Sequence, residues 1–296
     1  MGEEQFGPEG MGSTARPLLQ HPLVAMLVAV LVYIFAAAFG IAFGSAVTAG
    51  QPATGIVQTA INVGLTLIAY KLVVTHLGAN PRDDLPAADA VANLGKGLVA
   101  GALLFSAIVA AAGLLGIYRI VGEGHWRELV LPLFVTAVAP GFMEEVLFRG
   151  IFFRWIEEWG GSWAALVVTS ALFGIAHILN PGATLFSSFA IAVEAGVLLG
   201  GAYMLTRSLW MPIGLHAAWN FTQGAIFGVP VSGIPTAGIF KGKLSGPQIL
   251  SGGRFGLEAS VIALLIATAS GAWFVRLALR RGELVRPSWV RRASAC

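Results

Sequence analysis

A run of 25 residues from Leu23 to Val47 contains no charged side chain. A helix rises about 1.5 Å per residue, so this run can cross the roughly 30 Å hydrocarbon core of a bilayer with some tilt. Of the 296 residues, 56% are apolar and only 11% are charged, which is too few charges to coat a water-facing surface. The chain is therefore predicted to be a membrane protein made of helices.

Further apolar segments follow at short intervals and carry Gly-xxx-Gly spacings, which let helices pack closely in lipid. The predicted fold is an all-α, polytopic membrane helix bundle of about eight transmembrane helices. A Gly-rich loop is expected near 228–256. The predicted spans are 23–47, 53–74, 97–117, 129–156, 162–179, 183–205, 209–227 and 257–279.

Four regions are expected along the chain. A polar segment covers residues 1–21, and N-terminal transmembrane helices cover 22–128. A core made of the fourth to seventh predicted spans covers 129–229, and residues 230–296 form a loop, the last transmembrane helix and an Arg-rich tail.

The distribution of Lys and Arg predicts the orientation in the membrane. With both termini in the cytoplasm, 12 of these residues fall on the inner side and 5 on the outer side, while Arg149 lies within a span. Because inner loops are enriched in Lys and Arg, we expect a multi-pass protein of the cell membrane with both ends cytoplasmic. The net charge of +3 gathers at helix ends and in the tail, so no nucleic-acid partner is expected. The single cysteine, Cys296, excludes an intramolecular disulfide and a Cys-x-x-Cys metal site.

Two adjacent carboxylates, Glu144 and Glu145, lie with Arg149 inside the fourth predicted span. A charge at such a position costs about 2.5 to 3.5 kcal/mol by insertion scales, so each needs a partner or a function. Glu145 and Arg149 are four residues apart and share a helical face, which predicts an ion pair. Glu144 is turned about 100° away and stays free for chemistry. Glu194 in the sixth span is expected to pair with Arg149 or Arg207, the alternative being that it faces a cavity.

Polar residues within two later spans extend this set. His177 ends the fifth span, and His216 and Asn220 lie four apart on one face of the seventh. Each alone is explained equally well by a hydrogen bond between helices. Together with Glu144 they supply a base to activate water, groups to hold that water, and donors for an oxyanion. One glutamate and two histidines also match the three ligands of a catalytic zinc ion, and the spacing does not decide between these versions.

The three patterns Glu-Glu-xxx-Arg, Phe-xxx-His and His-xxx-Asn occur in this order on successive predicted helices. In this respect residues 129–225 resemble the CPBP (CAAX protease and bacteriocin-processing, Abi) family of intramembrane proteases, which is related to the type II CAAX prenyl endopeptidases. The resemblance implies that Glu144 activates water and that His177 helps to hold the water or a metal. It further implies that His216 and Asn220 stabilise the oxyanion.

In the same resemblance, Glu145 and Arg149 are supporting residues. The implied chemistry runs either with Zn²⁺ held by Glu144, His177 and His216, or by a metal-free glutamate mechanism. Glu194 lies outside the three motifs, so the resemblance assigns it no role.

The expected function is that of an intramembrane endopeptidase acting on a membrane-associated or prenylated-type protein or peptide. The expected partners are that substrate and the lipid bilayer, while the sequence predicts no oligomeric state. A non-catalytic membrane scaffold, or a subunit that stabilises a partner, is the alternative on the same fold. The intact set of Glu144, His177, His216 and Asn220 favours the enzyme, because a scaffold does not need all four.

Overall fold

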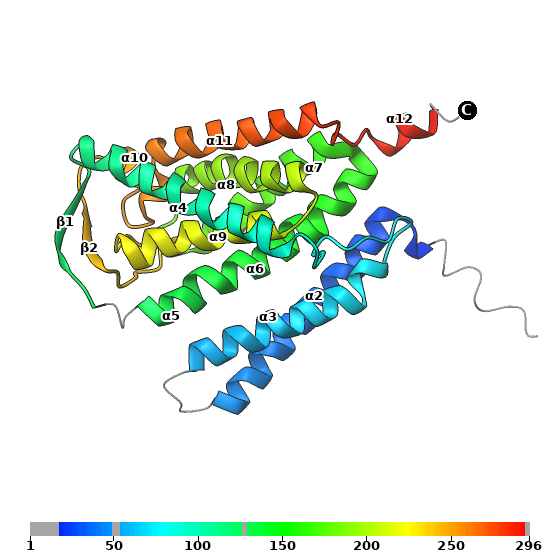
Figure 1. The fold of residues 1–296 in the computed structure, drawn as a ribbon, viewed down its shortest axis with the longest axis horizontal. Helices are drawn as coiled ribbons and strands as arrows, with labels where there is room; N and C mark the ends of the chain where they lie inside the picture. The colour runs from blue at the N-terminus through cyan, green and yellow to red at the C-terminus, as the bar shows by residue number, and fades with distance from the viewer. Residues whose placement is uncertain (1–17, 49–53, 126–128, 294–296) are drawn as a thin grey trace, which may run out of the picture.

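The computed structural model describes residues 18–48, 54–125 and 129–293. Most of the predicted polar segment 1–21, and Cys296, lie outside the described residues. Within them, the chain forms a bundle of helices with one two-stranded sheet at one end, and the C-terminal helix extends from the other end (Figure 1).

The first two spans form a helical hairpin beside the rest of the bundle (Figure 1). Helix α2 (Pro22–Thr48) packs on α3 (Thr54–Leu72), which a short 3-10 turn, η1 (Val74–His76), continues. Gly40 and Gly44 are buried at the contact, where a Cβ on Gly40 would lie 2.1 Å from the Asn62 side chain. The close packing that the Gly-xxx-Gly spacing predicts is therefore confirmed.

Helix α4 (Ala90–Leu114) leads into strand β1 (Tyr118–Glu123), which pairs antiparallel with β2 (Phe240–Leu244). The sequence did not predict this sheet: it extended the third span to residue 117 and made 228–256 a loop. Each strand has only five or six residues and finds its partner more than 100 positions away. Local apolar patterns carry little information about such a pairing.

The fourth and fifth predicted spans form one continuous helical segment, Val130–Leu179. Gly161 bends it, because its φ of 83° lies in the left-handed region that favours glycine. Pro140 is tolerated because it occupies the first turn of α6, between two π-helical stretches. The parts are α5 (Val130–Pro132), η3 (Leu133–Val138), α6 (Ala139–Glu145), η4 (Val146–Phe153), α7 (Arg154–Ala176) and η5 (His177–Leu179).

The remaining helices complete the bundle, with α8 against both α7 and α11, and α9 against α4. Close backbone contacts join α4 and α9, where a Cβ on Gly97 would meet the Met211 carbonyl at 2.2 Å. Here the elements are α8 (Leu185–Thr206), α9 (Trp210–Phe221), η6 (Thr222–Ile226), α10 (Gln248–Ser251), η7 (Leu257–Ala259), α11 (Val261–Arg280) and α12 (Ser288–Ala293).

Six helices in the described chain are long and apolar enough to cross a membrane. The predicted all-α membrane bundle is confirmed, although the count differs from the eight expected. One difference is the merged segment 130–179. The other is the predicted span 209–227, which is a 12-residue helix, α9, followed by the five-residue π-helix η6.

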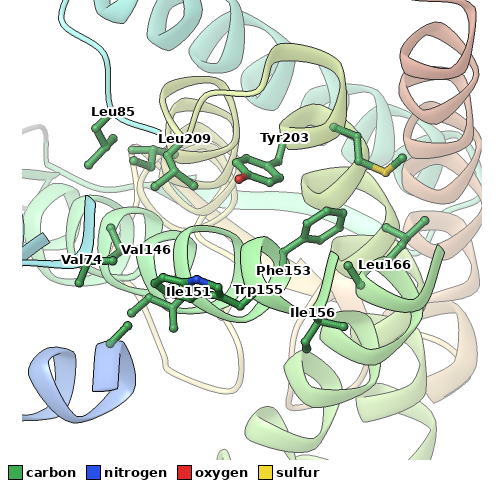
Figure 2. Close-up of a cluster of buried hydrophobic side chains, with 14 of the residues drawn as sticks. Val74, Leu85, Val146, Ile151, Phe153, Trp155, Ile156, Leu166, Tyr203 and Leu209 are labelled. Atoms are coloured by element: carbon green, nitrogen blue, oxygen red, sulfur yellow. The ribbon is translucent and has the colours of Figure 1, made fainter. Parts of the chain in front are cut away.

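A buried aromatic and aliphatic cluster joins the hairpin to the core, with Phe153, Trp155 and Tyr203 at its centre (Figure 2). Beside it, buried Asp84 accepts hydrogen bonds from Tyr70 and Tyr203 and forms ion pairs with Arg82 at 2.9 Å and with Arg154 at 3.6 Å. Burial raises the pKa of Asp84, while the two arginines oppose this shift. This network ties the loop before α4 to α3, α7 and α8.

Candidate active site

Glu145 and Arg149 form the predicted ion pair. Their side chains are fully buried, and Arg149 Nη1 lies 2.8 Å from Glu145 Oε1. Helix α6 ends at Glu145 and continues into the π-helical η4, which carries Arg149. The other guanidinium nitrogen, Nη2, donates to the Ala195 carbonyl at 3.1 Å, so the pair also fixes α8 against the first motif.

His216 of α9 contacts the same carboxylate. Its Nδ1 lies 2.8 Å from Glu145 Oε1, the oxygen that Arg149 also contacts. A carboxylate held by an arginine accepts hydrogen bonds, so Nδ1 carries the proton and donates it. The sequence assigned Glu145 to Arg149 alone. It missed the histidine because a separation of 71 residues leaves no periodic signal.

Glu144 faces a different histidine. Its Oε2 lies 4.0 Å from His177 Nε2 and has no hydrogen-bond partner among the residues that the structure describes. His177 Nδ1 lies 2.7 Å from the Phe173 carbonyl, which can only accept, so Nδ1 is the protonated nitrogen and Nε2 is an acceptor. A gap of 4.0 Å is too long for a direct hydrogen bond and suits one bridging water.

Asn220 lies one turn beyond His216 on α9. Its Nδ2 donates to the Thr136 carbonyl of η3 at 3.0 Å. This bond uses one of the two amide hydrogens and fixes the orientation of the side chain. The second hydrogen stays available to an acceptor.

His177, His216 and Asn220 line one cavity, which has a volume of about 30 Å³. That volume is enough to hold water. Phe173 forms part of the wall, with its ring against both histidines and beneath the Arg149 guanidinium. Glu144 is not among the lining residues, although its Oε2 lies 4.0 Å from His177 Nε2.

Glu194 does not form the pairing that the sequence favoured. Arg149 bonds Glu145 and the Ala195 carbonyl, while Arg207 pairs with Glu157 and Glu283. Glu194 is 1% exposed and faces the cavity. The charges of both arginines are already compensated by carboxylates nearer to them, so the alternative interpretation holds.

The predicted zinc ligands do not converge. Within the described residues, no group of three or more His, Cys, Asp or Glu side chains is placed to hold a metal ion. Glu144 faces His177, while His216 is held by Glu145. The donor set of Glu144, His177 and His216 therefore does not fit a zinc ion in this conformation.

Two further residues of the cavity, Ser232 and Glu258, were missed by the sequence analysis. Both belong to the region expected to be a loop and the start of the last span, outside the three motifs. A carboxylate directly before an apolar run was the available signal for Glu258.

Comparison with known proteins supports the motif assignment. Residues 126–222 match the family model of the type II CAAX prenyl endopeptidases, described as Rce1-like. The matched segment contains Glu144, Glu145, His177, His216 and Asn220, whereas Glu258 lies beyond it. No curated protein and no solved structure matched the chain. Residues 126–222, about a third of the chain, carry all three motifs, and this segment is similar to the Rce1-like family of type II CAAX prenyl endopeptidases.

Proposed function

We propose that this protein is an intramembrane endopeptidase that hydrolyses a peptide bond in a membrane-associated or prenylated-type protein or peptide. The observation that carries this proposal is the facing arrangement of Glu144 and His177, 4.0 Å apart and with Glu144 Oε2 unpartnered. The family match supports the same reaction class, since the family is one of CAAX-type endopeptidases.

The arrangement orients a water molecule for attack. One hydrogen of a water between the two residues points to Glu144 Oε2 and the other to His177 Nε2, leaving a lone pair for the substrate carbonyl carbon. Glu144 then takes the proton as the new C–O bond forms. The Phe173 carbonyl keeps His177 in the tautomer that accepts from the water.

His216 and Asn220 stabilise the negative charge that develops on the carbonyl oxygen. Glu145 accepts a hydrogen bond from His216 Nδ1–H and supports a protonated imidazole, whose Nε2–H is the first donor. The second amide hydrogen of Asn220 is the other donor, held in place by the Thr136 carbonyl. Glu145 and Arg149 act on the reaction through His216.

The proposed mechanism passes through no metal ion, because Glu144, His177 and His216 do not converge. We place the enzyme in the cell membrane with both termini in the cytoplasm, which the excess of Lys and Arg on the inner side supports. The lipid bilayer and the substrate are its proposed partners.

The proposal is tested by comparing the terminal peptides of membrane-associated proteins in cells that produce the wild type or Glu144→Ala at matched levels. New peptide ends that occur only with the wild type support the protease and identify its substrate. Identical peptide ends, with a partner protein lost only when the whole chain is deleted, contradict it and favour the membrane scaffold.

A further inference from the structure

Two buried carboxylates, Glu194 and Glu258, face the cavity behind the catalytic histidines. Glu194 lies near the middle of α8 and is 1% exposed, while Glu258 lies in η7, directly before the last span, and is 2% exposed. Both line the cavity together with His177, His216 and Asn220. Neither has a role in the mechanism described above.

The two carboxylates differ in their partners. Glu258 Oε1 accepts a hydrogen bond from the Ser232 backbone amide, and the Ser232 and Gln223 side chains also bond this carboxylate. Glu194 Oε2 is buried and has no hydrogen-bond partner in the part of the chain that the structure describes. Within the same residues, no Lys or Arg forms an ion pair with either carboxylate.

The charged groups around the pair come from several elements. His177 of η5 and His216 of α9 line the same cavity, and Arg149 of η4 reaches the Ala195 carbonyl beside Glu194. On α7, the ionisable side chains Arg154, Glu157 and Glu158 bond elsewhere, to the Asp84 network, to Arg207 and to Asn80.

Helix α11 brings no charge close to the pair. It runs parallel to α8, with Gly271 against Leu198 and Val275 against Gly201, and its first ionisable residue, Arg276, comes after these contacts. Glu194 lies before Leu198 on α8, level with an uncharged part of α11. Among the described residues no Lys or Arg pairs with Glu194 or Glu258, and the groups of the cavity lining that can carry a positive charge are His177 and His216.

One protonated histidine, His216, can compensate one of the two carboxylates, but a second ionised carboxylate in this buried cavity is still unfavourable, because burial and mutual repulsion both oppose its charge. Such a pair keeps one proton and titrates as a unit. Burial raises the pKa of Glu258 to about 7, in the direction this argument requires. At neutral pH the cavity therefore contains a carboxylic acid as well as a carboxylate.

We propose that Glu194 and Glu258 share one proton and supply it to the amine leaving group of the substrate. The inference rests on the proposed peptidase function. Water gives one proton to Glu144 and its oxygen bonds to the carbonyl carbon; when the C–N bond breaks, the nitrogen takes the proton of the pair. The proton on Glu144 is then released and the pair is reprotonated from water, so the reaction is balanced.

The positions of the carboxyl groups support the assignment of Glu144 as the base and of the Glu194–Glu258 pair as the acid. Glu144 is not among the residues that line the cavity, whereas Glu194 and Glu258 line it together with His216 and Asn220. The site then has a base outside the cavity lining and an acid within it. Hydrolases often use two carboxyl groups in different environments, one that stays protonated and acts as an acid and one that stays ionised.

The first test is the pH dependence of kcat for full-length protein in lipid vesicles, measured on a quenched fluorescent peptide with a farnesylated Cys-aliphatic-aliphatic-X end. Because the pair can donate a proton only while it holds one, the wild-type kcat falls as the pH rises and Glu194 and Glu258 lose their shared proton. Glu194→Gln or Glu258→Gln removes the repulsion, so the remaining acid loses its proton more easily and the alkaline limb moves to lower pH. The double variant loses the part of the limb that the pair sets and keeps the part that deprotonation of His216 sets, and its kcat falls by about 10²-fold or more.

Glu123→Gln, which neutralises an exposed carboxylate on β1, is the control and leaves the profile unchanged. An alkaline limb that stays at the wild-type pH in both single variants overturns the inference. So does a loss of kcat that is equal at every pH, because that result indicates a structural role. Wild-type protein that cleaves no peptide contradicts the proposed function instead.

A second measurement does not depend on activity. Infrared difference spectra of the full chain, recorded during a pH titration, detect the carbonyl stretch of protonated carboxyl groups. The wild type is expected to show such a band at pH 7 that is absent from Glu194→Gln/Glu258→Gln and retained in Glu123→Gln. Identical bands in all three proteins would mean that the pair holds no proton.

Discussion

Glu145 Oε1 lies 2.8 Å from His216 Nδ1, and the same oxygen lies 2.8 Å from Arg149 Nη1. One buried carboxylate thus orients a histidine from another helix while an arginine compensates its charge. The neighbouring Glu144 takes no part in this network and is directed to His177 instead. Two consecutive glutamates therefore have separate structural tasks, and their substitution should have different effects.

We expect Glu145→Gln to lower both stability and activity, whereas Glu144→Gln lowers activity alone. A neutral side chain at 145 leaves the buried Arg149 without its counter-charge, which costs about 3 to 5 kcal/mol for a buried pair. Glu144 is partly exposed and forms no comparable pair. Thermal unfolding in detergent micelles checks the difference. Equal melting temperatures for the two variants would contradict the assigned tasks.

Asn220→Ala should lower kcat by about 10² to 10³ and leave KM almost unchanged. An oxyanion donor interacts mainly with the charge of the transition state, so its loss affects turnover more than binding. Steady-state kinetics on the farnesylated reporter peptide separate the two constants. Asn62→Ala in α3, outside the cavity lining, is the matched control. An unchanged kcat would remove Asn220 from the mechanism.

The network around Asp84 gives a prediction for stability. Asp84→Ala removes two hydrogen bonds and two ion pairs and leaves the buried Arg154 uncompensated, so we expect a loss of about 3 to 5 kcal/mol. Asp83→Ala is the control, because Asp83 is 41% exposed and its ion pair with Lys71 is worth about 0 to 1 kcal/mol. The free energy of unfolding in micelles checks both values. Similar losses for the two variants would contradict the role of the network.

Removal of metal ions distinguishes the zinc mechanism from the metal-free glutamate mechanism, between which the sequence did not decide. Because Glu144, His177 and His216 do not converge, we expect kcat to survive prolonged treatment with a chelator. The rate after dialysis against chelator, and again after addition of Zn²⁺, is the measurement. Loss of activity that zinc restores would show that the three side chains come together on a metal and would contradict the metal-free mechanism.

Much of the fold could be predicted because lipid imposes a strong pattern. Long uncharged runs mark the spans, and Gly40 and Gly44 mark a close helix contact that the structure contains. The β1–β2 sheet could not be predicted, since each strand depends on a partner far along the chain. The continuation of one helical segment through Gly161 also escaped prediction, because a glycine that bends a helix cannot be distinguished in the sequence from one that ends it.

The candidate site was predictable only within single helices. The pairing of Glu145 with Arg149 follows from helical spacing, and it is present. The choice of histidine for each glutamate depends on how separate helices pack, which no local pattern encodes. Glu258 lies outside every motif, so its position beside Glu194 in the cavity emerges only from the fold.

The central claim is that Glu144 activates the attacking water. The most direct measurement is the initial rate of cleavage of the farnesylated reporter peptide by purified protein in lipid vesicles, for the wild type and for Glu144→Gln. The account predicts a rate at least about 10² lower for the variant, with an unfolding temperature like that of the wild type. A folded Glu144→Gln protein that cleaves at the wild-type rate would contradict it.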